Sequence, residues 1–73
     1  MDKDLRIIEL ERELADTRRA AVSIIMGMAE GIAPSAEGRA ELAKGFREAA
    51  DDPAADPATA RLALLVAMEL ERR

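Results

Sequence analysis

The chain has 73 residues and a net charge of -4, and it contains neither cysteine nor histidine. This composition excludes disulfides, disfavours a structural zinc site, and gives no electrostatic attraction to nucleic-acid phosphates. The apolar residues are almost all aliphatic, and Phe46 is the only aromatic residue, a bias typical of helices rather than sheets. We therefore expect one all-α domain over residues 1–73.

The first predicted helix spans residues 4–30 and is the longest element, about 40 Å at 1.5 Å per residue. Gly31 is placed at its C-cap, and Pro34 prevents its continuation. Read in heptads, the helix places an apolar seam along one face, in which Thr17 is the polar exception. The seam positions are Ile7, Leu10, Leu14, Thr17, Ala21, Ile24, Met28 and Gly31.

The two halves of this helix differ in their pattern. The first half is two-faced, with charged residues opposite the narrow seam. From Ala20 to Met28 the apolar residues cover almost the whole circumference, so we expect the two later helices to enclose these turns. The early turns are expected to project and to need a partner. The spacing of Ser23, Gly27 and Gly31 is interpreted as a groove that receives one of the later helices.

Charged residues flank the seam in a pattern that favours helix pairing. Arg6 and Glu13 lie on one side, and Glu11 and Arg18 lie on the other. A parallel self-pair would set Arg6 near Glu11 and Glu13 near Arg18 of the second chain. An antiparallel pair can also match opposite charges among these four residues. Because exposed ion pairs contribute only about 0.2–1 kcal/mol each, the sequence leaves the orientation open.

The second predicted helix, residues 35–50, begins at Ser35, whose hydroxyl can cap the first backbone N–H groups. It is amphipathic: Leu42 and Phe46 point toward the core. On its polar face, Lys44 and Glu48 have the spacing of an i,i+4 ion pair.

The third predicted helix, residues 57–72, follows a loop that two prolines stiffen. Asp56 is expected at its N-cap and Pro57 at its first position. This helix is more apolar than a three-helix monomer can hide, so one face, including Leu64 and Met68, is expected to meet a second subunit. The alternative is that the second half of the first helix covers those residues.

Catalytic and metal-binding patterns are absent from the sequence. The few serine and threonine hydroxyls have no histidine to activate them, and Asp51 and Asp52 lie in a loop that would keep them solvated. We expect no enzyme activity, cofactor or metal. Whether a small ligand binds around Met26, Met28 and Met68 is left open, because methionines more often fill cores.

The leading hypothesis is a cytoplasmic protein–protein interaction module that forms a helical homodimer or a higher homo-oligomer. Two alternatives are kept: a small acidic inhibitor of bacteriophage type that occludes a host protein, and a transcriptional accessory protein. We expect no nucleic-acid partner and no membrane segment, since the longest apolar stretch is about half the length that a bilayer requires. The expected interface residues are Ile7, Leu10, Leu14, Thr17, Leu64 and Met68, with Arg6, Glu11, Glu13 and Arg18 as flanking charges.

Overall fold

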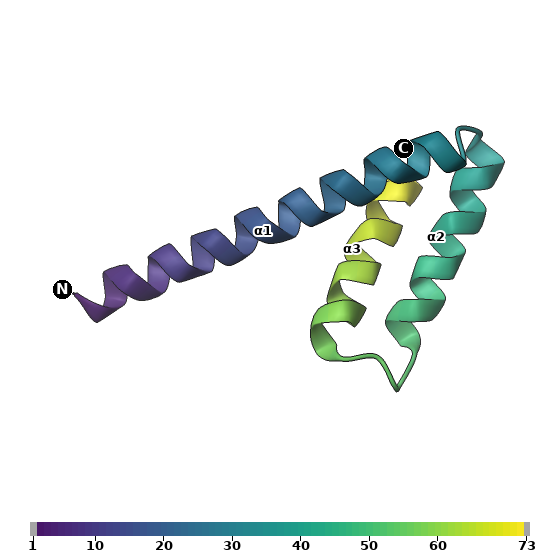
Figure 1. Ribbon diagram of the computed structural model, residues 1–73. Coiled ribbons are helices and arrows are strands. Elements are labelled where there is room, and N and C mark those ends of the chain that lie inside the picture. The colour runs from purple at the N-terminus through teal and green to yellow at the C-terminus, as the bar shows by residue number, and fades with distance from the viewer. Residues whose placement is uncertain (1, 73) are drawn as a thin grey trace.

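The computed structural model describes residues 2–72 and is all-helical over that range, which confirms the predicted class. Its elements are α1 (Lys3–Ile32), α2 (Ala36–Asp51) and α3 (Pro57–Arg72). In Figure 1, α2 and α3 form an antiparallel hairpin, the second half of α1 lies across one end of it, and the first half extends away as a free rod. The molecule is therefore elongated, with principal extents of 51 × 27 × 16 Å.

The C-terminal end of α1 differs from the prediction. The helix continues through Gly31 to Ile32, and the capping residue is Ala33, whose backbone N–H donates to the carbonyl oxygen of Ala29 at 2.8 Å. The assignment of Gly31 as the C-cap is thus wrong. Proline restricts the residue before it to extended conformations, and Ala33, before Pro34, has φ -135° and ψ 77°. The proline ends the helix, and no left-handed glycine is needed.

The starts of the two shorter helices agree with the local signals in the sequence. Ser35 is the N-cap of α2, and its Oγ accepts a hydrogen bond of 3.0 Å from the backbone N–H of Gly38. Before Pro57, the carboxylate of Asp56 accepts bonds from the backbone N–H and the hydroxyl of Thr59, at 2.9 and 2.7 Å. These bonds, the hydroxyl bond first, lower the pKa of Asp56.

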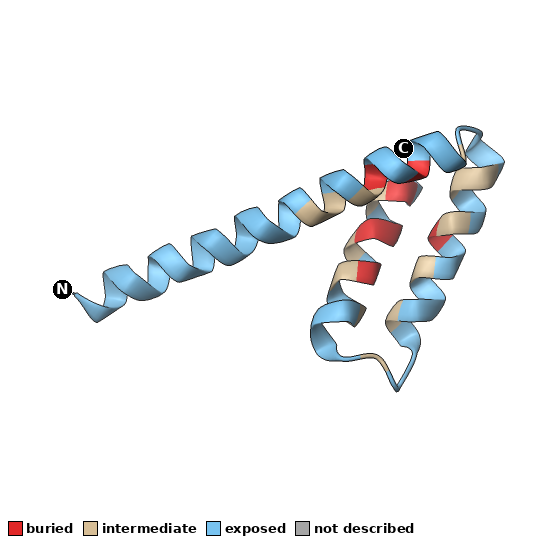
Figure 2. Ribbon diagram, viewed as in Figure 1, coloured by how far each residue is buried: buried red, intermediate tan, exposed pale blue. Residues whose placement is uncertain are grey.

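The hydrophobic core lies where α1 crosses the α2–α3 hairpin. Val66 of α3 is fully buried at its centre. In Figure 2, the buried positions are confined to this junction and to the facing sides of the hairpin, while the first half of α1 is exposed throughout. The core side chains are Met26, Ala29, Ala43, Val66 and Leu70, and Val22, Ile25, Leu42 and Phe46 pack against them.

An ion pair joins α2 to α3. Arg47 Nε donates to Glu71 Oε2 at 2.6 Å, and a second bond joins the other guanidinium nitrogen to Oε1. This contact lowers the pKa of Glu71 and raises that of Arg47. The pair predicted within α2, Lys44 with Glu48, does not form. Both side chains are exposed, where water competes with such contacts.

The second half of α1 is not enclosed, contrary to the prediction from its all-round apolar composition. Ile24 is 66% exposed and Met28 is 61% exposed, although Met26 between them is buried. The physical reason is that α1 packs on one side of a two-helix layer, so only one of its faces meets protein. The composition of a helix shows how apolar it is, but the number of neighbouring helices is a property of the whole fold.

The small residues of α1 are not in close contact with another helix of the same chain. Ser23, Gly27 and Gly31 are all exposed. A Cβ atom built on Gly27 or on Gly31 would meet no atom within 4 Å apart from its immediate helix surroundings. The interpretation as a close packing face is therefore wrong, although Ser23 and Gly27 border the groove between α1 and α3.

Candidate interaction surface

One face of α1 is apolar and open to solvent over nearly the whole helix. We call this face the α1 seam. Apart from Ala21, which is half-buried, its residues are exposed. From Ile7 to Gly31 it extends for about 36 Å at 1.5 Å per residue. The seam comprises Ile7, Leu10, Leu14, Thr17, Ala21, Ile24, Met28 and Gly31.

The helical phase explains why the seam stays open while α1 is packed on the hairpin. The packing residues Val22 and Ala29 each follow a seam residue, Ala21 or Met28, by one position. One position corresponds to a rotation of about 100° around the helix. The seam and the packing face are thus two different sides of the same helix. A second helix can lie along the seam without displacing the hairpin.

The predicted interface residues fall on two separate surfaces. Those of the first helix lie on the seam and are exposed, whereas Leu64 and Met68 are exposed on α3. Each of these two residues is two positions from the buried Val66, a rotation of about 200°, so both face away from the core. The groove between α1 and α3 is lined by neither of them but by residues such as Leu65. The structure does not bring the two predicted groups together.

The seam is longer than the interface that was predicted from the sequence. Ile24 and Met28 continue it into the second half of α1, and Ile32, beside the seam, is 74% exposed. The heptad pattern contained Ile24 and Met28, but the apolar residues around them obscured their role. Ile32 was missed because the helix was expected to end at residue 30.

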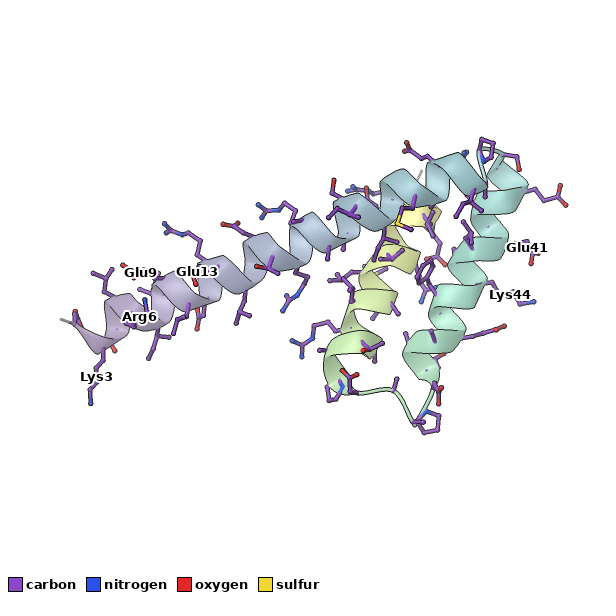
Figure 3. All side chains as sticks on the ribbon, in the orientation of Figure 1. Lys3, Arg6, Glu9, Glu13, Glu41 and Lys44 are labelled. Atoms are coloured by element: carbon purple, nitrogen blue, oxygen red, sulfur yellow. The ribbon has the colours of Figure 1, made fainter. Side chains whose placement is uncertain are left out.

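The charges that flank the seam are available to a partner. Arg6 contacts Glu9 of the same helix at 3.8 Å, a distance typical of a weak exposed pair. Within residues 2–72, Glu11, Glu13 and Arg18 form no ion pair. Figure 3 shows Arg6, Glu9 and Glu13 on the free first half of α1, far from the α2–α3 hairpin.

The methionines do not gather into a common site. Met26 is buried in the core, Met28 lies on the α1 seam, and Met68 is exposed on α3. These are three different environments. In the part of the chain that the structure describes, no group of three or more acidic residues is placed to hold a metal ion. No helix between residues 2 and 72 is long and apolar enough to cross a membrane.

Comparison with protein families, curated proteins and solved structures gives no match to this chain. The molecule's own surface is therefore the guide to its function. Ten large apolar side chains are exposed between residues 2 and 72, and five of them lie on the α1 seam. Because half of these side chains share one straight stripe, the seam is the candidate functional site.

Proposed function

We propose that the chain is a non-catalytic self-association module that forms a homodimer through the α1 seam. The observation that supports this proposal is the exposure of the seam from Ile7 to Met28, interrupted only by the half-buried Ala21. Burying apolar surface is favourable by about 25 cal/mol per Å², and soluble monomers rarely leave an extended apolar surface uncovered. A second helix along the stripe removes this surface from water.

The length of the seam favours a second copy of α1 as the partner helix. A stripe of about 36 Å needs a helix of at least some 24 residues to cover it. α1 has 30 residues, whereas α2 and α3 have 16 each. The α1 helix of another chain therefore has both the length and an identical apolar stripe. Such a self-complementary contact gives a closed twofold dimer.

The small core gives a physical reason for association. Of the seven buried hydrophobic residues, four are alanines, so each chain buries little apolar side-chain volume. Domains of this size bury only about 60% of the surface that the unfolded chain exposes, and association is a common supplement. Dimerisation also shields the first half of α1, which is exposed in the monomer.

Replacing an apolar seam residue with a charged one tests the proposal. Leu10→Glu places a charge within the interface, so we expect a monomer, measured as molar mass by light scattering. Leu5→Glu is the matched control, because Leu5 is also exposed on α1 but lies off the seam. It should remain a dimer. Equal masses for the two variants would contradict the assignment of the seam.

The same measurement separates self-association from the inhibitor role. A seam that serves a different protein leaves the wild-type chain monomeric on its own. A dimeric wild type that Leu10→Glu dissociates supports the homodimer.

A further inference from the structure

We infer that the two α1 helices pair in parallel and in register, so that both hairpins lie at the same end of the dimer. This inference rests on the proposed self-association through the α1 seam. It comes from the residues that border the seam on its two sides. One flank consists of Arg6, Glu13, Ala20 and Gly27, and the other flank consists of Glu11, Arg18, Ile25 and Ile32.

A parallel pair brings complementary flanking charges together. In such a pair, each residue of the first flank lies opposite the residue five positions later in the second chain. Arg6 then faces Glu11 of the other chain, and Glu13 faces Arg18. Twofold symmetry repeats both contacts. Three of these four side chains have no ion-pair partner within residues 2–72, so only the weak exposed contact between Arg6 and Glu9 competes with the new pairs.

The same register matches the shapes of the flanking residues farther along the helix. Gly27 faces the exposed Ile32 of the other chain, so a small residue meets a large one. Ala20 faces Ile25, which is half-buried against its own core. At Gly27 there is open space even for an added Cβ, and Ile32 is a large side chain with little cover of its own. The isoleucine of one chain can therefore pack against the glycine of the other.

The best antiparallel register gives fewer favourable contacts between the flanking residues. It sets Ile7 against Ile24 of the second chain, so Arg6 faces a glycine and Glu13 faces an alanine. Only the contact between Glu11 and Arg18 remains attractive.

The polar seam residue also distinguishes the two arrangements. In the antiparallel register, Thr17 lies against Leu14, which offers its hydroxyl no hydrogen-bond partner. In the parallel register the two Thr17 hydroxyls face each other and can bond.

Cysteine cross-linking tests the orientation, because the natural chain contains no cysteine. Leu10→Cys lies on the seam, and a parallel pair brings the two copies within the usual disulfide range of about 4.4–6.8 Å between Cα atoms. In the antiparallel pair these copies are 11 residues apart along the axis, about 16 Å. Each would face Ala21 instead. Arg12→Cys, on the side opposite the seam, is the control.

We expect Leu10→Cys to oxidise to a covalent dimer. Arg12→Cys should give much less covalent dimer. A mixture of Leu10→Cys and Ala21→Cys should give the two homodimers and little heterodimer by mass spectrometry. A dominant heterodimer, or a dimer in which Leu10→Cys does not cross-link, would overturn the parallel orientation but leave self-association intact. A monomeric wild-type chain would overturn self-association itself.

Charge exchange provides a second readout that introduces no cysteine. Glu13→Arg should weaken dimerisation by about two- to thirty-fold, since two exposed pairs are lost per dimer. Adding Arg18→Glu should restore it. If Glu13→Arg with Arg18→Glu does not restore dimerisation, whereas Glu11→Arg with Arg18→Glu dimerises normally, the helices pair antiparallel instead.

Discussion

Replacing Leu14 with alanine should weaken the dimer strongly and the fold of the single chain very little. Leu14 is 64% exposed, so pairing covers about two thirds of a side chain whose complete burial contributes about 1.5–3 kcal/mol. The loss is therefore about 1–2 kcal/mol per chain, or about 2–4 kcal/mol per dimer. This corresponds to a dissociation constant raised by about 30-fold to several hundred-fold.

The measurement is sedimentation equilibrium over a concentration series, with the helix content checked by circular dichroism at each concentration. Leu5→Ala is the matched control: Leu5 is 51% exposed on the same helix but off the seam, so its dissociation constant should change by less than about threefold. The reasoning is refuted if Leu14→Ala changes the dissociation constant no more than Leu5→Ala does.

Three further predictions concern the hairpin and its junction with α1. Leu70→Ala removes a buried core side chain and should lower the free energy of unfolding by about 2–5 kcal/mol, measured with urea. Ser35→Ala removes the hydroxyl that caps α2 and should cost about 0.5–2 kcal/mol. The pKa of Glu71 is lowered by its hydrogen bond with Arg47. The ion pair should therefore contribute fully to the free energy of unfolding above the ordinary pKa of glutamate, and this contribution should be lost as the pH falls through the lowered pKa.

Each of these predictions has its own contrary result. A Leu70→Ala protein with an unchanged urea midpoint would show that the α1–hairpin junction is not the core. For the cap, Ser35→Asp is the control, because an aspartate can accept the same backbone bond. If Ser35→Asp and Ser35→Ala lose equal stability, the capping bond is not the cause. For the acid response, Glu71→Gln should flatten the decrease of the urea midpoint at low pH, and an identical slope would exclude the Arg47 contact as its source.

The elements of this fold could be predicted from the sequence because their signals are local. Ser35 and the Asp56–Pro57 pair start α2 and α3 through hydrogen bonds to residues three positions away. Pro34 also acts locally, on the residue before it. The C-cap was wrongly assigned to Gly31 because a glycine and a proline, which both signal the end of a helix, lie close together there. Pro34 determines where the helix ends.

The exposure of the second half of α1 could not be predicted in this way. Ile24 and Met26 have similar apolar character, yet one is exposed and the other is buried. The difference depends on the side from which the hairpin approaches, which is set by contacts between residues far apart in the chain. For α3, by contrast, the surplus of apolar residues indicated that a face including Leu64 and Met68 stays outside the core, and both are exposed.

The positions of the seam were predictable, but the exposure of its second half was not. Ile7, Leu10 and Leu14 stand in the heptad pattern and are exposed as that pattern indicated. The structure adds that the stripe continues past the core junction, because the hairpin occupies a face about 100° away. This continuity favours a partner helix as long as α1.

Sedimentation equilibrium of the wild-type chain at micromolar concentration tests the central proposal most directly. A homodimer should have a mass of twice the 7.9 kDa of one chain, decreasing toward 7.9 kDa on dilution. A folded, fully helical species that stays at the mass of one chain at every concentration would contradict it.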